Sequence, residues 1–299
     1  MSKYRSHFLF LLLLTSFSLI AQEKEELEWI DLLNGTDLSG WDIKIAGHEI
    51  NDNYLNTFRT EEGVLSINYD EYESFDEKYG HLYYHQPYSY YRLKFEYRFL
   101  GNQLKGGAVW NVRNSGVMIH SQSAESNDLG QHFPVSVEVQ LLGGLSDGKE
   151  RTTGNICTPG TYVEMKEAAV MDHCINSNSK TYHGDQWVSV EVIVLGDSLI
   201  QHIVEGDTVI TYHSPRVDEI FVNEQTYNWE EAEIENPQDW KKQAHSKLKE
   251  GYIALQAESH PIEFREIQLV NLKGCTDPNA TNYKSYYLKS DNSTCIYKK

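Results

Sequence analysis

Residues 91–99 read YRLKFEYRF, and this stretch decides the fold because its odd-numbered residues are apolar or aromatic while its even-numbered residues are charged. A period of two places alternate side chains on opposite faces of an extended chain, so the stretch predicts a half-buried antiparallel strand. The same alternation recurs at residues 63–68, 135–141, 188–194 and 262–269. A helix is expected only within residues 229–249, where Pro237 interrupts the pattern. Many strands and few helices predict an all-β fold, a two-sheet antiparallel sandwich of the jelly-roll kind.

The amino-acid composition agrees with an all-β fold and limits the kinds of partner that the protein can bind. The 299 residues include 26 Lys and Arg against 44 Asp and Glu, a formal net charge of −18, and 40% of them are hydrophobic. A chain with this apolar share can bury a core and is not disordered. Its negative charge repels phosphates and no basic cluster offsets it, so we expect no nucleic-acid partner and favour a neutral ligand.

Residues 1–21 have the layout of a secretory signal. Lys3 and Arg5 precede an apolar run at residues 8–14, and the segment ends in Ala21. The run is too short to span a bilayer comfortably, so cleavage after Ala21 is favoured over an uncleaved anchor. We therefore expect a periplasmic or extracellular protein with no transmembrane segment after cleavage.

Four cysteines lie in the exported part of the chain, at positions 157, 174, 275 and 295. Four cysteines allow three pairings, which sequence alone does not distinguish. In a compartment that permits oxidation we favour pairing of neighbours, Cys157 with Cys174 and Cys275 with Cys295. Zinc is the weaker alternative. The sequence has no C-x-x-C pair, and His173 and Cys174 have no further ligand at the spacing of a metal site.

The strand pattern ends at about Lys273, which predicts a sandwich over residues 22–273 and a separate short motif over residues 274–299. So short a segment cannot bury its own core and needs the Cys275–Cys295 bond. Its polar residues miss the spacing of a calcium loop, so a disulfide-stabilised turn is favoured over an ion site. The sequence requires no cofactor, and a divalent metal is possible but unsupported.

Four groups of motifs occur in order: LNGTDLSGW at 33–41, NSGV at 114–117, VEVQLL at 137–142, and IALQ at 253–256 followed by PIEFREI at 261–267. Together they resemble the 3-keto-disaccharide hydrolase family over about residues 28–272. The resemblance implies a concanavalin A-like sandwich, a sugar substrate and cleavage of glycosides already oxidised at C3. The last residues are similar to a cysteine motif that ends exported proteins of Bacteroidetes-type bacteria, which implies export.

The implied reaction needs three groups in the site. A ketone at C3 acidifies the C2 hydrogen, so a base removes it, the glycosidic oxygen leaves C1, and water then adds. The site therefore needs a base at C2, a group that stabilises the enolate oxygen, and an acid at the leaving oxygen. A sandwich glycanase would instead place two carboxylates about 5–9 Å apart. Glu138 has only Gln140 two positions on, which disfavours the glycanase.

Glu138 and His120 are the catalytic candidates. Glu138 alternates with core residues and so lies on an open face, while His120 is expected on the same side of its strand as Gly116 and Met118. Histidine supplies a base near neutral pH. The structural alternatives are a solvated strand carboxylate for Glu138 and a structural histidine for His120.

The substrate-binding candidates share non-core strand positions or the loops beside them: Arg113, Asn114, Gln140, Trp110, Gln256, Glu258 and His81. Arg113 and Asn114 begin the turn before the His120 strand and could hold the enolate oxygen. Trp110 is the candidate for stacking on a sugar, although a core role is common for aromatic residues. For Asn114 the alternative is turn chemistry.

A second function class also fits this sequence. The same sandwich hosts non-catalytic, lectin-like carbohydrate-binding modules, and fold does not fix function. Product formation from a 3-keto-glycoside, as against retention on a glycan column, separates the enzyme from the binding module.

Overall fold

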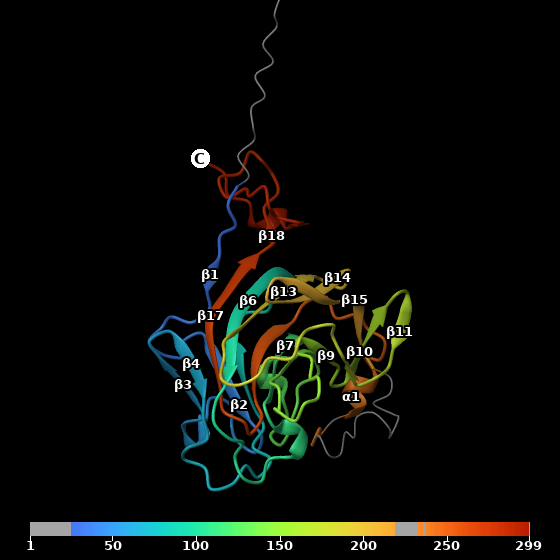
Figure 1. Ribbon diagram of the computed structural model, residues 1–299. Helices are drawn as coiled ribbons and strands as arrows, with labels where there is room; N and C mark the ends of the chain where they lie inside the picture. Colours follow the sequence, from blue (N-terminus) through green and yellow to red (C-terminus); the bar gives the residue numbers. More distant parts are fainter. Residues whose placement is uncertain (1–24, 219–232, 236, 299) are drawn as a thin grey trace, which may run out of the picture.

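The computed structural model describes residues 25–218, 233–235 and 237–298, and in it two antiparallel sheets pack face to face (Figure 1). The larger sheet follows the order β11-β10-β15-β14-β13-β6-β17-β4-β3, and β1 pairs with β17. Its strands are β1 (Ile30–Asp31), β3 (Phe58–Glu61), β4 (Val64–Ile67), β6 (Tyr90–Phe99), β10 (Thr161–Met165), β11 (Ala168–Val170), β13 (Val188–Leu195), β14 (Leu199–Val204), β15 (Asp207–Val217) and β17 (Ile262–Asn271).

The second sheet follows the order β12-β9-β8-β7-β16-β5-β2. Its strands are β2 (Trp41–Ile45), β5 (Gly80–Tyr84), β7 (Asn114–Ser121), β8 (Val137–Leu142), β9 (Asn155–Cys157), β12 (Cys174–Ile175) and β16 (Tyr252–Ala257). The expected two-sheet antiparallel sandwich is confirmed.

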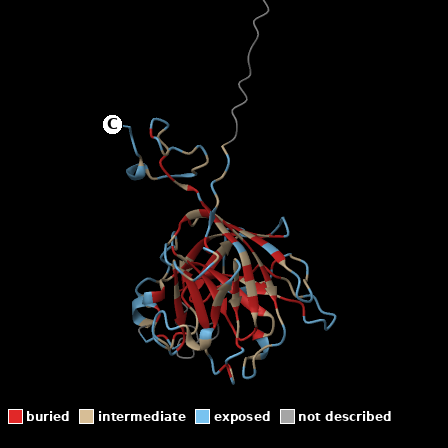
Figure 2. Cartoon of the chain, turned by 90° about the vertical axis from the view of Figure 1, so that its left-hand side faces the viewer, coloured by how far each residue is buried: buried red, intermediate tan, exposed pale blue. Residues whose placement is uncertain are grey.

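The alternating segment that suggested the fold is β6, at the centre of the larger sheet. Its odd-numbered residues are buried, and Phe95 pairs with Val190 of β13 while Tyr97 pairs with Phe264 of β17. Burial of each such side chain stabilises the fold by about 1.5–3 kcal/mol. Figure 2 shows the buried positions concentrated in the strands and the exposed ones in the loops.

The helices are short. They are η1 (Tyr54–Asn56), η2 (Val109–Asn111), η3 (Ala124–Ser126), α1 (Pro237–Lys241) and η4 (Asn292–Thr294). Pro237 does not interrupt α1 but begins it. Backbone N–H groups in the first turn of a helix have no partner within the helix, so a proline, which lacks this group, fits there. The rest of the expected helical range lies partly outside the described residues. No helix in the described ranges is long and apolar enough to cross a membrane.

Both expected disulfides are confirmed, Cys157–Cys174 and Cys275–Cys295. The second closes the C-terminal motif, in which β18 (Lys273–Gly274) pairs in parallel with β19 (Lys289–Ser290) at one end of the sandwich (Figure 1). Lys284 of this motif binds Glu28 and lies 3.6 Å from Glu25. The motif is therefore tied to the segment that leads into β1. The predicted signal at residues 1–21 lies outside the described residues.

Candidate functional site

The open face of the second sheet carries a row of polar side chains. Val117 of β7 pairs with Val139 of β8 and with Leu255 of β16, all three buried toward the sandwich core. Their neighbours on the strands therefore point to the opposite face. The row on this face is formed by Gln140, Gly116, Gln256 and His81.

Gly116 makes room for the carboxylate of Glu138. A Cβ atom at position 116 would lie 2.6 Å from Cγ of Glu138, closer than any real Cβ contact. The Glu138 side chain thus crosses the strand surface above Gly116. Asn114 and Gly116 belong to β7 itself, so the expectation that Asn114 begins a turn before the strand is wrong.

Glu258 lies beside Glu138, although the two come from different parts of the chain. It follows β16 directly, is 2% exposed, and its Oε2 has no hydrogen-bond partner in the described part of the chain. Burial raises the pKa of Glu138 to about 8. Burial, and then the charge of Glu138, raise the pKa of Glu258 well above its ordinary value. Two buried carboxyl groups this close retain a proton between them at neutral pH.

This carboxyl pair corrects one premise taken from the sequence. The two residues lie on β8 and after β16, with β7 between the two strands. A search for a second carboxylate on the strand of Glu138 therefore does not find Glu258. The sequence names Glu258 as a substrate-binding candidate but not as the partner of Glu138. The lack of a second carboxylate therefore no longer counts against a glycanase, and acid–base chemistry by two carboxyl groups is available at this face.

His81 and Gln256 form a polar floor next to the pair. They are paired in register, and both are buried. Nε2 of His81 and Oε1 of Gln256 find no partner among the residues described. Burial lowers the pKa of His81 to about 3, so its imidazole is neutral and can donate or accept a hydrogen bond. Unpaired buried polar atoms of this kind call for a ligand or an ordered water.

Gln140 and Asn114 border this floor. Asn155 donates from Nδ2 to Oε1 of Gln140 at 3.0 Å, which fixes the Gln140 side chain. Asn114 donates from Nδ2 to the carbonyl of Trp110 at 3.2 Å, and its Oδ1 is buried without a partner within the described ranges. Asn114 thereby connects the η2 turn to the open face.

His120 lies away from the carboxyl pair, and its expected orientation is wrong. Met118 pairs with Ala254 and Ser121 with Tyr252, so β7 carries one extra residue at this point, and His120 has a φ of 50°. Such a bulge reverses the side-chain alternation beyond it. The His120 Nε2 instead lies 3.1 Å from the carbonyl of Gly196, in the turn between β13 and β14. Burial lowers the pKa of His120 to about 4.

Arg113 is also held by a loop. Its Nη2 donates to the carbonyl of Gly184, and its Nη1 lies 3.5 Å from Asp185. Its guanidinium carbon is 5.5 Å from the centre of the Phe99 ring. These contacts leave only Nε without a partner among described atoms, so Arg113 is anchored beside the site.

The sequence analysis missed Arg151 and His260. Nη1 of Arg151 donates to the carbonyls of Val112 and Gly143 at 2.7 and 2.8 Å, and the Arg151 charge lowers the pKa of Glu258 against the effect of burial. His260 is 2% exposed and has both ring nitrogens unpaired in the described structure. Neither residue belongs to an alternating strand pattern, so no local signal identified them.

An aromatic wall stands at the edge of this face, formed by Tyr79, Trp110 and Phe133. The Tyr79 and Trp110 rings are nearly parallel, with centroids 6.2 Å apart, and Phe133 lies 4.7 Å from Tyr79. The centroid of His81 is 6.3 Å from that of Phe133, so the wall meets the polar floor. Trp110 is 54% exposed and therefore is not a core residue.

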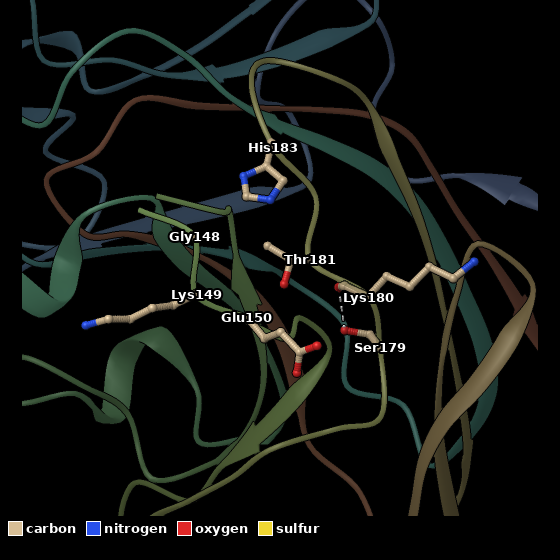
Figure 3. A pocket seen from close by; sticks show the side chains of 7 residues that line it. All are labelled: Gly148, Lys149, Glu150, Ser179, Lys180, Thr181 and His183. Atoms are coloured by element: carbon tan, nitrogen blue, oxygen red, sulfur yellow. Dashed lines mark hydrogen bonds between the residues drawn. The ribbon is translucent and has the colours of Figure 1, made fainter. Parts of the chain in front are cut away.

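A pocket of about 410 Å³ lies among the loops near Arg151 (Figure 3). Its lining is polar: Gly148, Lys149, Glu150, Ser179, Lys180, Thr181 and His183. None of the residues predicted from the sequence lines it. The Arg151 backbone N–H donates to Oγ1 of Thr181 at 2.7 Å. The loop that carries Arg151 therefore contacts this pocket as well as the carboxyl pair.

Metal-ligand geometry is not found in the described ranges, where no three His, Cys, Asp or Glu side chains gather. The zinc alternative at Cys174 is wrong, because the disulfide bond removes its thiolate. In the C-terminal motif, Oδ1 of Asp277 accepts hydrogen bonds from Asn279, and Oδ2 accepts one from Tyr297.

Several solved structures are similar to this chain. Two proteins from Parabacteroides distasonis ATCC 8503, provisionally described as glycosyl hydrolases, are 15% and 17% identical, each with a TM-score of 0.46. The first match covers 82% of this chain and 99% of the other, and the second 81% and 93%. The exoplasmic/lumenal domain of VIP36 with Ca²⁺ and Man3GlcNAc is 12% identical, with a TM-score of 0.46 and coverage of 90% and 100%.

The family comparison is more specific. No functionally curated protein matches the chain in sequence. Residues 28–270 match the family described as the 3-keto-alpha-glucoside-1,2-lyase-like domain, which confirms the resemblance carried by the ordered motifs. Because this match spans most of the 299 residues, the chain belongs to the 3-keto-alpha-glucoside-1,2-lyase-like family.

Proposed function

We propose that the protein is an exported enzyme that cleaves 3-keto-glycosides, including 3-keto-disaccharides, at the glycosidic bond. The observation that carries the proposal is the buried pair of Glu138 and Glu258 beside an unpaired polar floor. The family match supports the substrate class, and a pair that shares one proton supplies an acid and a base together.

Glu138 acts as the base in the first step. Burial raises the Glu138 pKa to about 8, so the reactive form is the one that has given up this proton as the pH approaches that value. In that form its carboxylate takes the C2 proton, and the electron pair of the C–H bond forms the enolate of the C3 ketone. The enolate then forms the C1–C2 double bond as the C1–oxygen bond breaks, and Glu258 protonates the leaving oxygen. The pKa of Glu258 is raised further by its neighbour, which suits it to hold the proton until that moment.

Water completes the reaction and restores the pair. Glu258, now a carboxylate, takes a proton from the water that adds to C1, and Glu138 returns its proton to C2. The number of protons on the two side chains is the same before and after the cycle. Arg151, whose charge opposes the raised pKa of Glu258, stabilises the negative charge that develops near the pair.

The polar floor orients the oxidised sugar. The neutral His81 and the Gln256 amide, which are paired across β5 and β16, each have a hydrogen-bonding atom without a partner in the described structure. Sugar hydroxyls can satisfy both atoms without introducing charge. The second candidate is a binding module without catalysis. Such a module has no use for two buried carboxyl groups, and burying them lowers the stability of the fold.

The test compares a 3-keto-glucoside with the same glucoside bearing a plain C3 hydroxyl, in the presence and absence of a chelator. We expect cleavage of the oxidised substrate only, and the rates with and without the chelator show whether a divalent metal takes part. Reaction in heavy water should place deuterium at C2 of the released sugar, because the proton that Glu138 takes up exchanges with the solvent before it is returned to C2. Equal rates on both glucosides with no deuterium at C2 would support a glycanase, and retention without product would support a lectin-like module.

A further inference from the structure

The outer end of the aromatic wall presents two large apolar side chains to solvent. Val109 is 89% exposed and Trp110 54% exposed, and both belong to η2. Exposed apolar residues are common singly, but two together at the mouth of a candidate site indicate a binding surface. The Trp110 ring is fixed by its contacts, 6.2 Å from Tyr79 and 6.4 Å from Phe133 between centroids.

The wall also reaches the carboxyl pair. Asn111 donates from Nδ2 to the Tyr79 hydroxyl at 3.3 Å. Burial raises the pKa of Tyr79 to about 12, and the charge of Glu258 adds to this effect. The phenol is therefore neutral and near Glu258, the residue that would protonate the leaving oxygen. The aromatic wall therefore begins beside the residue that would protonate the leaving oxygen.

The pocket in Figure 3 is the competing place for a leaving group. His183 and Thr181 lie over its centre, whereas the ammonium groups of Lys149 and Lys180 point outward on opposite sides. Its lining offers hydrogen bonds to a polar group. However, neither Glu138 nor Glu258 lines this pocket. Arg151, which is hydrogen-bonded to Thr181 of the pocket, lies between the pocket and the carboxyl pair.

We propose that the aromatic wall is the leaving-group subsite and that it takes an aglycone with an aromatic ring. This inference rests on the proposed function. Ring faces and the Val109 side chain form the outer end of the wall, and offset stacking on Trp110 stabilises an aryl ring there. A sugar in that place would need several hydrogen-bonding groups around its ring. The lining of the Figure 3 pocket offers them, whereas the described part of the wall offers mainly ring faces and Val109, with the imidazole of His132 5.1 Å from the Tyr79 ring between centroids.

The kinetic test uses a 3-keto phenyl glucoside and a 3-keto-disaccharide. Trp110→Ala should lower kcat/KM for the phenyl substrate about tenfold or more and for the disaccharide by a clearly smaller factor, while Trp110→Phe should retain most of the activity on both. His183→Ala, the matched control in the Figure 3 pocket, should change neither rate. A loss caused by His183→Ala but not by Trp110→Ala would overturn the assignment.

A binding test separates this inference from the proposed function. Phenyl glucosides of both anomers lack the C3 ketone, so the proposed mechanism leaves them uncleaved. In saturation-transfer NMR, their aromatic protons should receive the stronger signal with the wild-type protein and with His183→Ala, and lose it with Trp110→Ala. Saturation confined to the sugar protons would refute the aromatic subsite, whereas absent turnover with intact aromatic saturation would refute only the proposed function.

Discussion

Glu138 reaches its place because residue 116 has no side chain. Gly116 does not need a positive φ, so alanine fits its backbone, and the clash with Glu138 is the whole consequence of adding a methyl group. Overpacking of this kind costs about 1–3 kcal/mol when neighbours must shift. The motif NSGV therefore matters for the placement of the Glu138 carboxyl group, the proposed base, and not for a turn.

Gly116→Ala should lower kcat by about a hundredfold or more, because it displaces the proposed base from C2. Circular dichroism should show that the sandwich still forms. The matched control is the same change in a Glu138→Gln background, where it should cost little further activity. A full additional loss in that background would mean that Gly116 acts on something other than Glu138.

Glu138→Gln should lower turnover by about two powers of ten or more. It should also change how stability depends on pH. Burial raises the folded-state pKa of Glu138 from 4.5 to about 8, so the folded state keeps a proton that the unfolded state loses, and this carboxyl destabilises the fold as pH rises through that window. Denaturant unfolding should show the free energy of unfolding of Glu138→Gln rising relative to wild type between about pH 4.5 and pH 8.

The exposed Glu125, in η3, provides the control for that measurement. Glu125→Gln should track the wild type across the same pH range. If Glu138→Gln also tracked the wild type, Glu138 would not be the buried, proton-retaining group described here.

At the scale of strands, the disulfide Cys157–Cys174 stands next to the site. Glu138 of β8 pairs with Cys157 of β9, and Cys157 pairs with Cys174 of β12. The bond therefore joins β12, the edge strand of the second sheet, to β9, the strand next to Glu138. The loop after β12 continues to Gly184, which accepts a hydrogen bond from Arg113. Loss of this bond frees the edge strand and the loop together.

Replacing Cys157 and Cys174 by alanine should reduce both activity and stability, the latter by about 2–4 kcal/mol. Replacing Cys275 and Cys295 in the same way provides the matched control, because that bond lies in the C-terminal motif. We expect kcat of the control to stay near wild type. Equal loss of kcat in both double variants would show that the first disulfide has no local effect on Glu138.

At the scale of the whole molecule, the C-terminal motif follows the last sandwich strand and contacts the sandwich at one end. Besides the Lys284 ion pairs, the backbone N–H of Leu288 donates to the carbonyl of Leu272 at 2.8 Å. Ser285 also donates to Glu25, and the backbone N–H of Lys289 donates to the same Leu272 carbonyl at 3.1 Å. The ion pairs are solvent-exposed, and such pairs contribute about 0–1 kcal/mol each.

A chain that ends at Lys273 should therefore fold and keep its activity. Thermal unfolding and turnover of a 3-keto-glucoside measure the two properties. A control that ends before β17, at Pro261, should not fold, because β17 pairs with both β4 and β6. Failure of the chain ending at Lys273 to fold would place the domain boundary after the motif.

The sequence predicts the sheets well because strand alternation is a local property. Residues 91–99 alternate with a period of two and form the buried centre of the larger sheet. The candidate site depends instead on which strands become neighbours. Glu138 was found in its motif, but its pairing with Glu258, the approach of Arg151 and the burial of His260 arise from strand order and loop course, which no local pattern records.

The extra residue at His120 bears on how relatives of this chain are compared. A β-bulge is one inserted residue in an otherwise regular ladder. A relative with a regular strand here should align with a one-residue gap between Met118 and Ser121. An ungapped alignment would place each residue beyond the bulge on the wrong face, and would match a residue facing the substrate with one that faces the core.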